Sequence, residues 1–249
     1  MDDQHGQYVA GLAPCGTCAV RDRAICNVLT GPGARELAAI TRHVSYEPGQ
    51  IIVAESESRE IVGTITSGVI KLTKALSDGR EQIVGLLFPS DFLGRVRAGE
   101  SRVYAEAVTK VDVCVFHAAR FRELNERYPD LKANIYERAL NEIDAAREWM
   151  VLLGRKTAEE KVATFLVMLA ERAKLAACLH EPDTDSLVFT LPMSRADMAD
   201  YLGLTIETVS RQVTRFKTSG VVRMLSGRDI LVPNIERLRT IAEGDAIGL

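Results

Sequence analysis

Residues 194–220 read SRADMADYLGLTIETVSRQVTRFKTSG and carry the start and stop signals of two short helices in succession. Ser194 and Asp197 have the spacing of a capping box, in which a hydroxyl and a carboxylate satisfy the first free amides of a helix. Gly203 stands where the first helix needs a left-handed residue to end, and Thr205 can cap the second helix. Two short helices joined by a tight glycine turn predict a helix-turn-helix, a unit that places one helix in the major groove of DNA.

The second predicted helix carries side chains that are suited to reading bases. Glu207, Ser210 and Arg211 are spaced i, i+3 and i+4, so they share one helix face. An arginine can bind O6 and N7 of guanine, a glutamate can accept from N4 of cytosine, and a serine can do either. Further cations are suited to phosphates, which position a domain without reading sequence: Arg195, Arg215, Lys217, Arg223 and Arg228. The simpler interpretation, a helical hairpin with solvated charges, leaves the coincidence of caps, turn glycine and base-reading set unexplained.

The sequence on either side completes a DNA-binding domain. Residues 156–179 have the apolar spacing of a helix, and residues 187–191 read as a short strand. Residues 221–225 and 229–232 flank a Ser-Gly-Arg turn and read as a hairpin wing. We therefore predict a winged helix-turn-helix domain over residues 156–249.

Residues 34–120 have the pattern of a β-roll, or jelly roll. Short apolar runs such as 50–53, 69–72, 82–87 and 111–116 alternate with turn signals at fairly even spacing. One of these turns contains Asp78, Gly79 and Arg80, which we expect at the tip of a hairpin. The fold class is therefore α+β, with an N-terminal β-roll sensor domain followed by helices.

A long helix is predicted over residues 121–155. Apolar and small residues recur there at alternating steps of three and four, which is the spacing of a dimer seam: Tyr136, Ala139, Ile143, Ala146, Met150 and Leu153. A helix packed on its own β-domain is the alternative, because three heptads are short for a coiled coil. The position between two predicted domains favours a dimerisation helix.

Cysteines mark the loop-rich segment 1–33. Cys15, Cys18 and Cys26 read C-x2-C-x7-C, and Cys114 lies alone in the apolar run 111–116. Strand alternation there places three valines on one face and Cys114 on the other, where the N-terminal segment could lie. Four thiols can form a disulfide framework, a structural zinc site or an iron–sulfur cluster. Cys178, the fifth cysteine, is interpreted as packing.

Composition limits the class of protein. The 249 residues suit two domains, and 47% hydrophobic with 26% charged residues is ordinary for a globular protein. A net charge of -3 argues against nonspecific coating of nucleic acid but permits a small basic patch. With no secretory signal and no apolar run long enough for a membrane helix, we expect a cytoplasmic protein with reduced thiols.

Enzyme and haem chemistry are not favoured. The sequence shows no Ser/His/Asp set, no paired carboxylates and no phosphate loop. The C-x-x-C pair lies in a loop-rich segment, whereas thiol oxidoreductases place it at the start of a helix in a βαβ unit. His43 and His117 are not in a recognisable haem context. We therefore predict that the chain is not an enzyme.

The order of β-roll, long helix and a helix-turn-helix bearing Glu-Thr-Val-Ser-Arg at 207–211 resembles the catabolite-activator superfamily of bacterial regulators. The cysteines narrow the resemblance to the fumarate-and-nitrate-reduction regulator (FNR) group. Their spacing, together with residues 145–157 and 199–205, is similar to the FnrL/FnrN branch of that group.

The resemblance implies an oxygen-labile [4Fe-4S] cluster on Cys15, Cys18, Cys26 and Cys114. It also implies a homodimer on inverted TTGAT-type half-sites of double-stranded DNA, with Glu207, Ser210 and Arg211 reading bases. RNA polymerase would be contacted by the 77–80 turn and the 180–186 loop, and the output would be control of anaerobic or microaerobic genes. The alternative function is the same DNA-binding scaffold with a structural zinc or thiol-redox site that senses another signal.

Two departures from the family pattern change what we expect. The seam position that corresponds to an acidic residue in better-known members is Ala146, so a lasting dimer is plausible without the repulsion that weakens the apo dimer. Residues 99–107 lack the Arg-Ser-type phosphate cassette of the nucleotide-binding relatives, so no cyclic nucleotide is expected.

Overall fold

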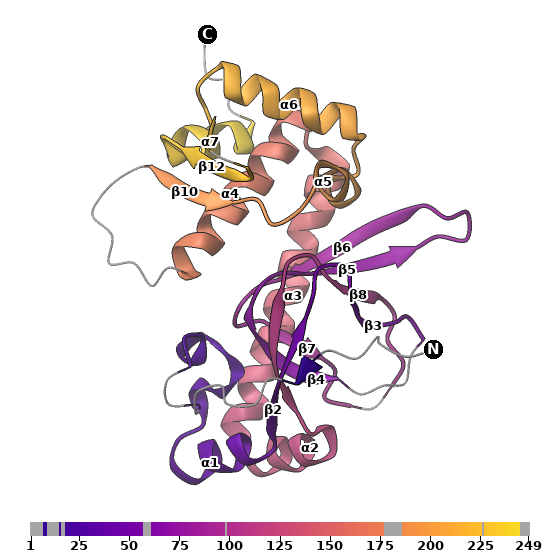
Figure 1. Ribbon diagram of the computed structural model, residues 1–249, viewed down its shortest axis with the longest axis vertical. Coiled ribbons are helices and arrows are strands. Elements are labelled where there is room, and N and C mark those ends of the chain that lie inside the picture. Colours follow the sequence, from indigo (N-terminus) through magenta and orange to yellow (C-terminus); the bar gives the residue numbers. More distant parts are fainter. Residues whose placement is uncertain are drawn as a thin grey trace. The chain divides into compact units, whose positions relative to one another are not determined.

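Two antiparallel sheets form the β-roll in the computed structural model (Figure 1). The five-stranded sheet has the order β1 (Gln7–Tyr8), β2 (Thr41–Tyr46), β9 (Val111–Phe116), β4 (Val62–Ser67) and β7 (Phe92–Gly94). The four-stranded sheet has the order β3 (Ile51–Val53), β8 (Tyr104–Ala107), β5 (Ile70–Ala75) and β6 (Glu81–Leu87). The structure describes residues 7–8, 15, 18–56, 61–97, 99–176, 186–225 and 227–244. Cys178 and residues 180–185 of the predicted polymerase loop lie outside these ranges.

Alternation along β9 separates the inside of the roll from its outer face. Val111, Val113 and Val115 are at most 3% exposed and lie in the roll's core with Ile65 of β4 and Ile70 of β5. Their burial follows from the two-residue period of a strand, since one face of the sheet closes over the other sheet. The prediction that the valines fill the roll is therefore confirmed.

The N-terminal segment is more regular than its glycines suggest. It contains the 3-10 helices η2 (Arg21–Arg23) and η3 (Ile25–Val28), followed by helix α1 (Gly31–Ala39). The expectation of a loop-rich segment over residues 1–33 is wrong from residue 21 onward. Pro32 lies in the first turn of α1, where its missing amide hydrogen is not needed and its fixed φ favours the helix.

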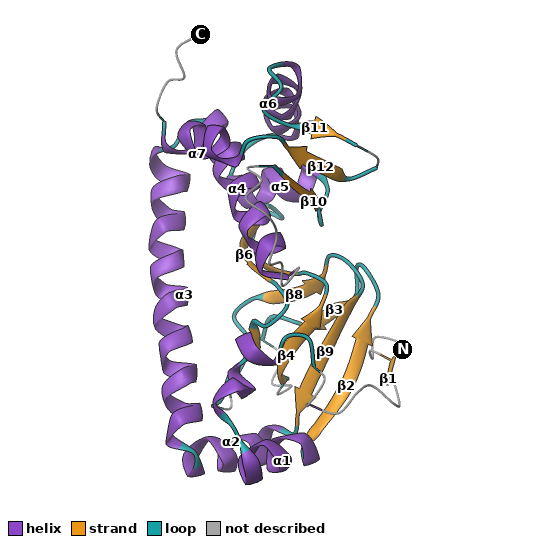
Figure 2. Cartoon of the chain, turned by 90° about the vertical axis from the view of Figure 1, so that its left-hand side faces the viewer, coloured by secondary structure: helices purple, strands orange, loops and turns teal. Residues whose placement is uncertain are grey.

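The predicted helix over residues 121–155 is two helices, α2 (Ala118–Arg127) and α3 (Pro129–Arg155). The break falls at Tyr128, which is extended at φ -110° and ψ 97°. Pro129 disfavours the helical conformation for the residue before it and can itself begin a helix. Figure 2 shows α3 as a long uninterrupted helix. The chain divides into two compact units at 144/145, within α3.

The second unit is a winged helix-turn-helix. Its elements are α4 (Ala158–Ala176), β10 (Leu187–Thr190), α5 (Arg195–Leu202), α6 (Ile206–Thr218), β11 (Arg223–Met224), β12 (Asp229–Val232) and α7 (Ile235–Glu243). The three strands pair antiparallel in the order β10-β12-β11, which confirms the predicted wing. Helix α7, capped by the side chain of Asn234, was not predicted. The predicted fold class of β-roll, long helix and winged helix-turn-helix is confirmed.

No helix in the described part of the chain has both the length and the apolar character needed to cross a membrane.

Candidate cysteine site and nucleic-acid interface

Cys114 lies on the outer face of the five-stranded sheet. On β9 it pairs directly with His43 of β2 and with Thr64 of β4, and directly opposed residues share a face of the sheet. The neighbouring pair confirms this geometry, because the Ser45 hydroxyl donates to the Asp112 carboxylate across the same two strands. The prediction that Cys114 faces away from the valine core is therefore confirmed.

The N-terminal segment packs onto this outer face. Cys26 and Cys114 both contact one apolar cluster, which joins η3, α1, the outer sheet face, α2 and α3: Ile25, Leu29, Leu37, Val62, Phe116, Phe121, Leu124 and Leu131. These eight side chains are at most 4% exposed. Cys26 and Cys114, although far apart in the sequence, are thus held against the same core.

The four thiols lie close enough together for the others to affect the pKa values of Cys26 and Cys114. Burial, with a smaller contribution from the thiols of Cys15, Cys18 and Cys26, raises the pKa of Cys114 to about 12, even though a hydrogen bond with Thr41 acts to lower it. Burial also raises the pKa of Cys26, with Cys18 adding to the effect. All four cysteines are half-buried and free of disulfides. A bound cation would replace the proton of such a buried thiol and convert it to a thiolate.

Arg21 ties the cysteine segment together. Its backbone amide donates to the carbonyl of Cys18 at 3.1 Å. Its guanidinium donates to the carbonyl of Cys15 at 3.3 Å and to that of Leu29 at 3.0 Å. The guanidinium charge also lowers the pKa of Cys26, against the larger effect of burial. One side chain therefore orders the backbone on both sides of the C-x7-C interval.

The thiols are not arranged around one point. Within the described ranges, no group of three or more His, Cys, Asp or Glu side chains could hold a single metal ion. Tetrahedral zinc would bring its sulfur ligands to about 2.3 Å from the metal, and so within about 4 Å of one another. A [4Fe-4S] cluster takes its four thiolates on four different iron atoms, so it accepts a wider set.

Helix α3 is connected directly to the cysteine segment. The guanidinium of Arg138 donates to the carbonyl of Arg23, and also to the carbonyl of Ser90 at 3.4 Å. Its Nε donates to Asn134 at 2.9 Å, and the Asn134 amide donates to Asn27 at 3.3 Å. Burial lowers the pKa of Arg138, while the charges of nearby acidic groups oppose this shift. The first half of α3 is thus bonded to the chain between Cys18 and Val28.

The predicted dimer seam lies largely on an exposed face of α3. Tyr136 is 63% exposed, Ile143 47% and Met150 64%, and the two predicted alanines, Ala139 and Ala146, are also exposed. Leu153, the last seam residue, is half-buried. The seam itself stays a prediction, but its large apolar side chains have no cover within the described part of the chain.

Helix α6 presents the predicted base-reading residues to solvent. The Ser194–Asp197 capping box, the left-handed Gly203 at φ 61° and the cap from Thr205 to the Thr208 amide are all present. One face of α6 is buried through Val209, Gln212, Val213 and Phe216. Glu207, Ser210 and Arg211 lie on the exposed side. Hydrogen bonds from its own amide and from Thr205 lower the pKa of Glu207, so its carboxylate stays ionised at the start of the helix.

The predicted phosphate-binding cations differ in solvent exposure and in the partners that their side chains already have within the protein. Lys217 and Arg223 are exposed. Arg228 is exposed and donates to the Pro192 carbonyl at 3.4 Å. Arg215 is paired with Glu159 of α4 at 3.4 Å, and Arg195 is half-buried with its guanidinium 3.2 Å from the Met198 sulfur. Lys217 and Arg223 are therefore the members of the set that most readily reach a phosphate.

The predicted hairpin tip is present between β5 and β6 and projects from its sheet (Figure 1). Gly79 has φ 87°, and the Asp78 carboxylate accepts from the Arg80 backbone at 3.1 Å and from its guanidinium at 2.8 Å. These bonds lower the pKa of Asp78. The tip is exposed, as a contact surface requires.

Known proteins share this arrangement. Sequence models of the Crp-like helix-turn-helix domain and of the cyclic nucleotide-binding domain match residues 160–241 and 43–128. A probable transcriptional activator of Rhizobium leguminosarum bv. viciae is 44% identical over 241 residues, which are 96% of this chain and 98% of the relative. Transcriptional activator protein FnrL of Cereibacter sphaeroides is 39% identical over 95% of both chains. The structure of FixK2 from Bradyrhizobium japonicum matches 84% of this chain and 100% of its own, with a TM-score of 0.72 and 32% identity.

The chain belongs to the Crp/FNR family of transcriptional regulators.

Membership of the Crp/FNR family makes the chain a DNA-binding transcriptional activator of the FNR/FixK group. Members of the family are regulators and not enzymes, so that prediction is confirmed. The family also assigns the winged domain its ligand, double-stranded DNA, and makes α6 its recognition helix.

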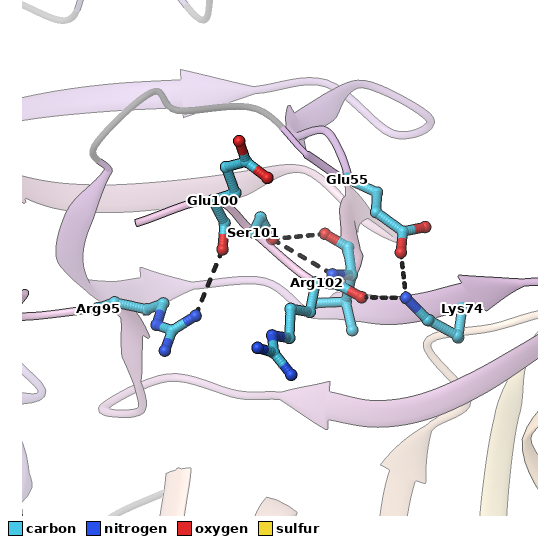
Figure 3. Close-up of polar contacts among 7 residues, drawn as sticks. Glu55, Lys74, Arg95, Glu100, Ser101 and Arg102 are labelled. Carbon is cyan, nitrogen blue, oxygen red and sulfur yellow. Dashed lines mark hydrogen bonds and ion pairs between the residues drawn. The ribbon is translucent and has the colours of Figure 1, made fainter. Parts of the chain in front are cut away.

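The β-roll has the fold of a Crp/FNR cyclic nucleotide-binding domain, and Figure 3 shows the polar groups around Ser101. The Lys74 ammonium is paired with the Glu55 carboxylate and donates to the Arg102 carbonyl at 2.8 Å. The Ser101 hydroxyl donates to the Val103 carbonyl at 2.7 Å. Lys74 and Ser101, two groups of the kind that bind a phosphate, are thus bonded to the protein itself.

The structure also adds residues that the sequence did not indicate. Thr41, His43 and Thr64 surround Cys114 on the sheet, and Arg138 joins α3 to the cysteine segment. Threonines in apolar strands and an arginine on an amphipathic helix are common, so no local signal distinguishes them. Their placement depends on the strand order β2-β9-β4, which only the fold reveals.

Proposed function

We propose that this chain is an oxygen-responsive regulator of anaerobic or microaerobic genes, in which Cys15, Cys18, Cys26 and Cys114 hold a [4Fe-4S] cluster. The observation that carries the proposal is that Cys26 and Cys114 contact one apolar cluster, while the thiols of Cys15 and Cys18 lie near enough to affect the pKa of Cys114. When bound, the cluster supplies an inorganic centre that oxygen can oxidise and dismantle. The chain supplies the thiols, the apolar surroundings and the ordered backbone.

The donor set fits this group better than zinc. Four thiols suit either, but the described part of the chain offers no compact group for a single ion. Burial raises the pKa of Cys114, so its thiol ionises when a bound cationic centre, whether zinc or a cluster, replaces the proton. Without that centre, the four cysteines are ordinary half-buried thiols.

Arg138 of α3 is hydrogen-bonded to the cysteine segment, so a movement of that segment can affect α3. Its hydrogen bonds to the Arg23 and Ser90 carbonyls depend on where the segment lies, and Ile25 and Leu29 pack in one cluster with Leu131 of α3. Release of the thiols would free the segment to move and would change the support of α3. Such a change switches DNA binding only if it favours one arrangement of α3 by a differential free energy.

We propose that the active form is a homodimer through the exposed seam of α3. Tyr136, Ile143 and Met150 recur every seven residues and would be buried against the same residues of a second copy. Ala146 leaves this seam without an acidic charge, which supports a dimer that persists when the cluster is absent. Two α6 helices would then read inverted TTGAT-type half-sites through Glu207, Ser210 and Arg211.

We propose that RNA polymerase contacts the exposed Asp78–Gly79–Arg80 tip. The exposed Asp78 and Arg80 side chains are paired and present both charges at the end of a hairpin. No role is proposed for a cyclic nucleotide, because Lys74 and Ser101 are committed to internal bonds.

Purification under strict anaerobiosis tests the cluster. We expect a brown protein with about four irons and four sulfides per chain. Cys114→Ser should lose the brown colour, while Cys178→Ser, the matched control at the fifth cysteine, should keep it. A colourless anaerobic protein that carries zinc would refute the proposal and favour the alternative of a structural metal on the same DNA-binding scaffold.

A further inference from the structure

Thr64 on β4 is a buried threonine whose hydroxyl makes no hydrogen bond within the described part of the chain. The residue is 2% exposed, and its Oγ1 has no hydrogen-bond partner in the described part of the chain. Burial of a hydroxyl without a partner destabilises a fold, since water no longer satisfies it. A valine of the same shape would avoid that penalty, and the Thr64 hydroxyl remains able to donate a hydrogen bond to a group placed beside it.

The position of Thr64 shows where that ligand would be. It lies directly across from Cys114, and its side chain is on the outer face of the sheet. Two residues earlier, Val62 faces Phe116, and both pack in the apolar cluster that Cys26 and Cys114 contact. The unpaired hydroxyl is therefore on the face that the cysteine segment covers.

Cys114 is approached from β2 as well. The hydroxyl of Thr41 is hydrogen-bonded with its thiol, and the single hydrogen of that hydroxyl is donated to the Leu37 carbonyl at 2.7 Å. The Thr41 hydroxyl therefore already donates its hydrogen within the protein, whereas the Thr64 hydroxyl donates to no described group. The two threonines flank one cysteine, and only Thr64 has a free donor.

We propose that Thr64 is a positioning residue for the inorganic centre, whose hydroxyl donates a hydrogen bond to a sulfur of that centre, either the Cys114 thiolate or an adjacent sulfide. This inference rests on the proposed function. Thiolate and sulfide sulfurs of iron–sulfur clusters carry negative charge and accept hydrogen bonds, and such bonds raise the reduction potential. Thr64 thus makes the centre harder to oxidise and slows its loss in oxygen.

Thr73 provides a matched control. It is also a buried threonine of the β-roll, 6% exposed, and its Oγ1 likewise has no partner among the described residues. It lies on β5 in the other sheet and pairs with Ile83 and Tyr104, not with a cysteine. Valine at either position removes a hydroxyl and keeps the shape, so a purely structural effect should be similar at the two sites.

The experiment compares Thr64→Val, Thr64→Ser and Thr73→Val, each prepared anaerobically as full-length protein. We expect Thr64→Val to lose its cluster absorption in air about five-fold faster than the parent, which corresponds to ~1 kcal/mol, the net contribution of one hydrogen bond. Its reduction potential, measured by spectroelectrochemistry, should shift to a more negative value. Thr64→Ser keeps the donor and Thr73→Val is remote, so both should match the parent.

Apo protein gives an independent readout. Removal of an unsatisfied hydroxyl should leave the apo melting temperature of Thr64→Val and Thr73→Val equal to or above that of the parent. Equal bleaching rates and potentials for Thr64→Val and the parent, with a full cluster in both, would overturn the role of Thr64 and leave the proposed function standing. A parent protein without any cluster would overturn the proposed function and this inference with it.

Discussion

Arg138→Ala should destabilise the first unit by removing the bonds that join α3 to the cysteine segment. The half-buried guanidinium donates to the carbonyls of Arg23 and Ser90 and to Asn134. Hydrogen bonds to a charged donor are worth about 1.5–3 kcal/mol when buried. These three bonds are only partly shielded from water, so we expect their combined loss to cost about 2 kcal/mol.

Thermal unfolding of the apo protein measures this loss. A loss of about 2 kcal/mol lowers the melting temperature by about 4–8 °C for a chain of this size. Arg138→Lys keeps the charge but not the planar fork, so it should fall between the parent and the alanine variant.

Lys132→Ala is the control on the same helix. Its ammonium is paired with Glu126 at 2.8 Å, but both side chains are more than half exposed. An exposed ion pair contributes about 0–1 kcal/mol, so the melting temperature should fall by less than ~4 °C. Equal shifts for Lys132→Ala and Arg138→Ala would refute the idea that Arg138 fastens the cysteine segment.

Four further variants test other parts of the account. Arg211→Ala should cost ~1–3 kcal/mol on specific DNA and relax discrimination at one base pair, whereas Lys217→Ala should weaken all DNA about equally and reduce the salt slope by about one, as measured by fluorescence anisotropy. Burial raises the pKa of Asp112, but hydroxyl donors led by Ser45 lower it by more, so the net shift is downward. A lowered pKa stabilises the fold above the unfolded value of about 3.9 and is lost as pH falls through the folded pKa; Ser45→Ala should therefore destabilise at pH 7 and have little effect near pH 2 in chemical unfolding. Ala146→Asp should place two like charges at the seam and shift sedimentation of the apo protein toward monomer, and an unchanged dimer would show that α3 pairs elsewhere.

The DNA-binding unit could be predicted largely from sequence because its signals are local. The capping box at Ser194, the left-handed Gly203 and the cap at Thr205 each depend on residues within one helical turn, and all three are present. Two errors in the first unit also had local signals. Pro32 favours the start of a helix, and Pro129 favours a break before it.

The surroundings of Cys114 could not be predicted in the same way. Alternation along β9 predicted that Cys114 lies on the face opposite the three valines, and the structure confirms that prediction. Which residues lie beside it depends on β2 and β4 flanking β9, although these strands are separated from it by long stretches of chain. His43 and Thr64 therefore become neighbours of Cys114 only in the folded sheet. In the same way, Arg138 of α3 becomes a neighbour of the cysteine segment only in the folded chain.

DNA binding measured on one sample before and after air is the most direct test of the central claim. Anaerobic protein is titrated with an inverted TTGAT-type duplex while cluster absorption is recorded, and the titration is repeated after exposure to oxygen. The account predicts that affinity for this duplex falls together with the cluster absorption, and that Cys114→Ser shows the low affinity throughout. Affinity that stays the same while the absorption disappears would contradict the claim that the four thiols control binding to DNA.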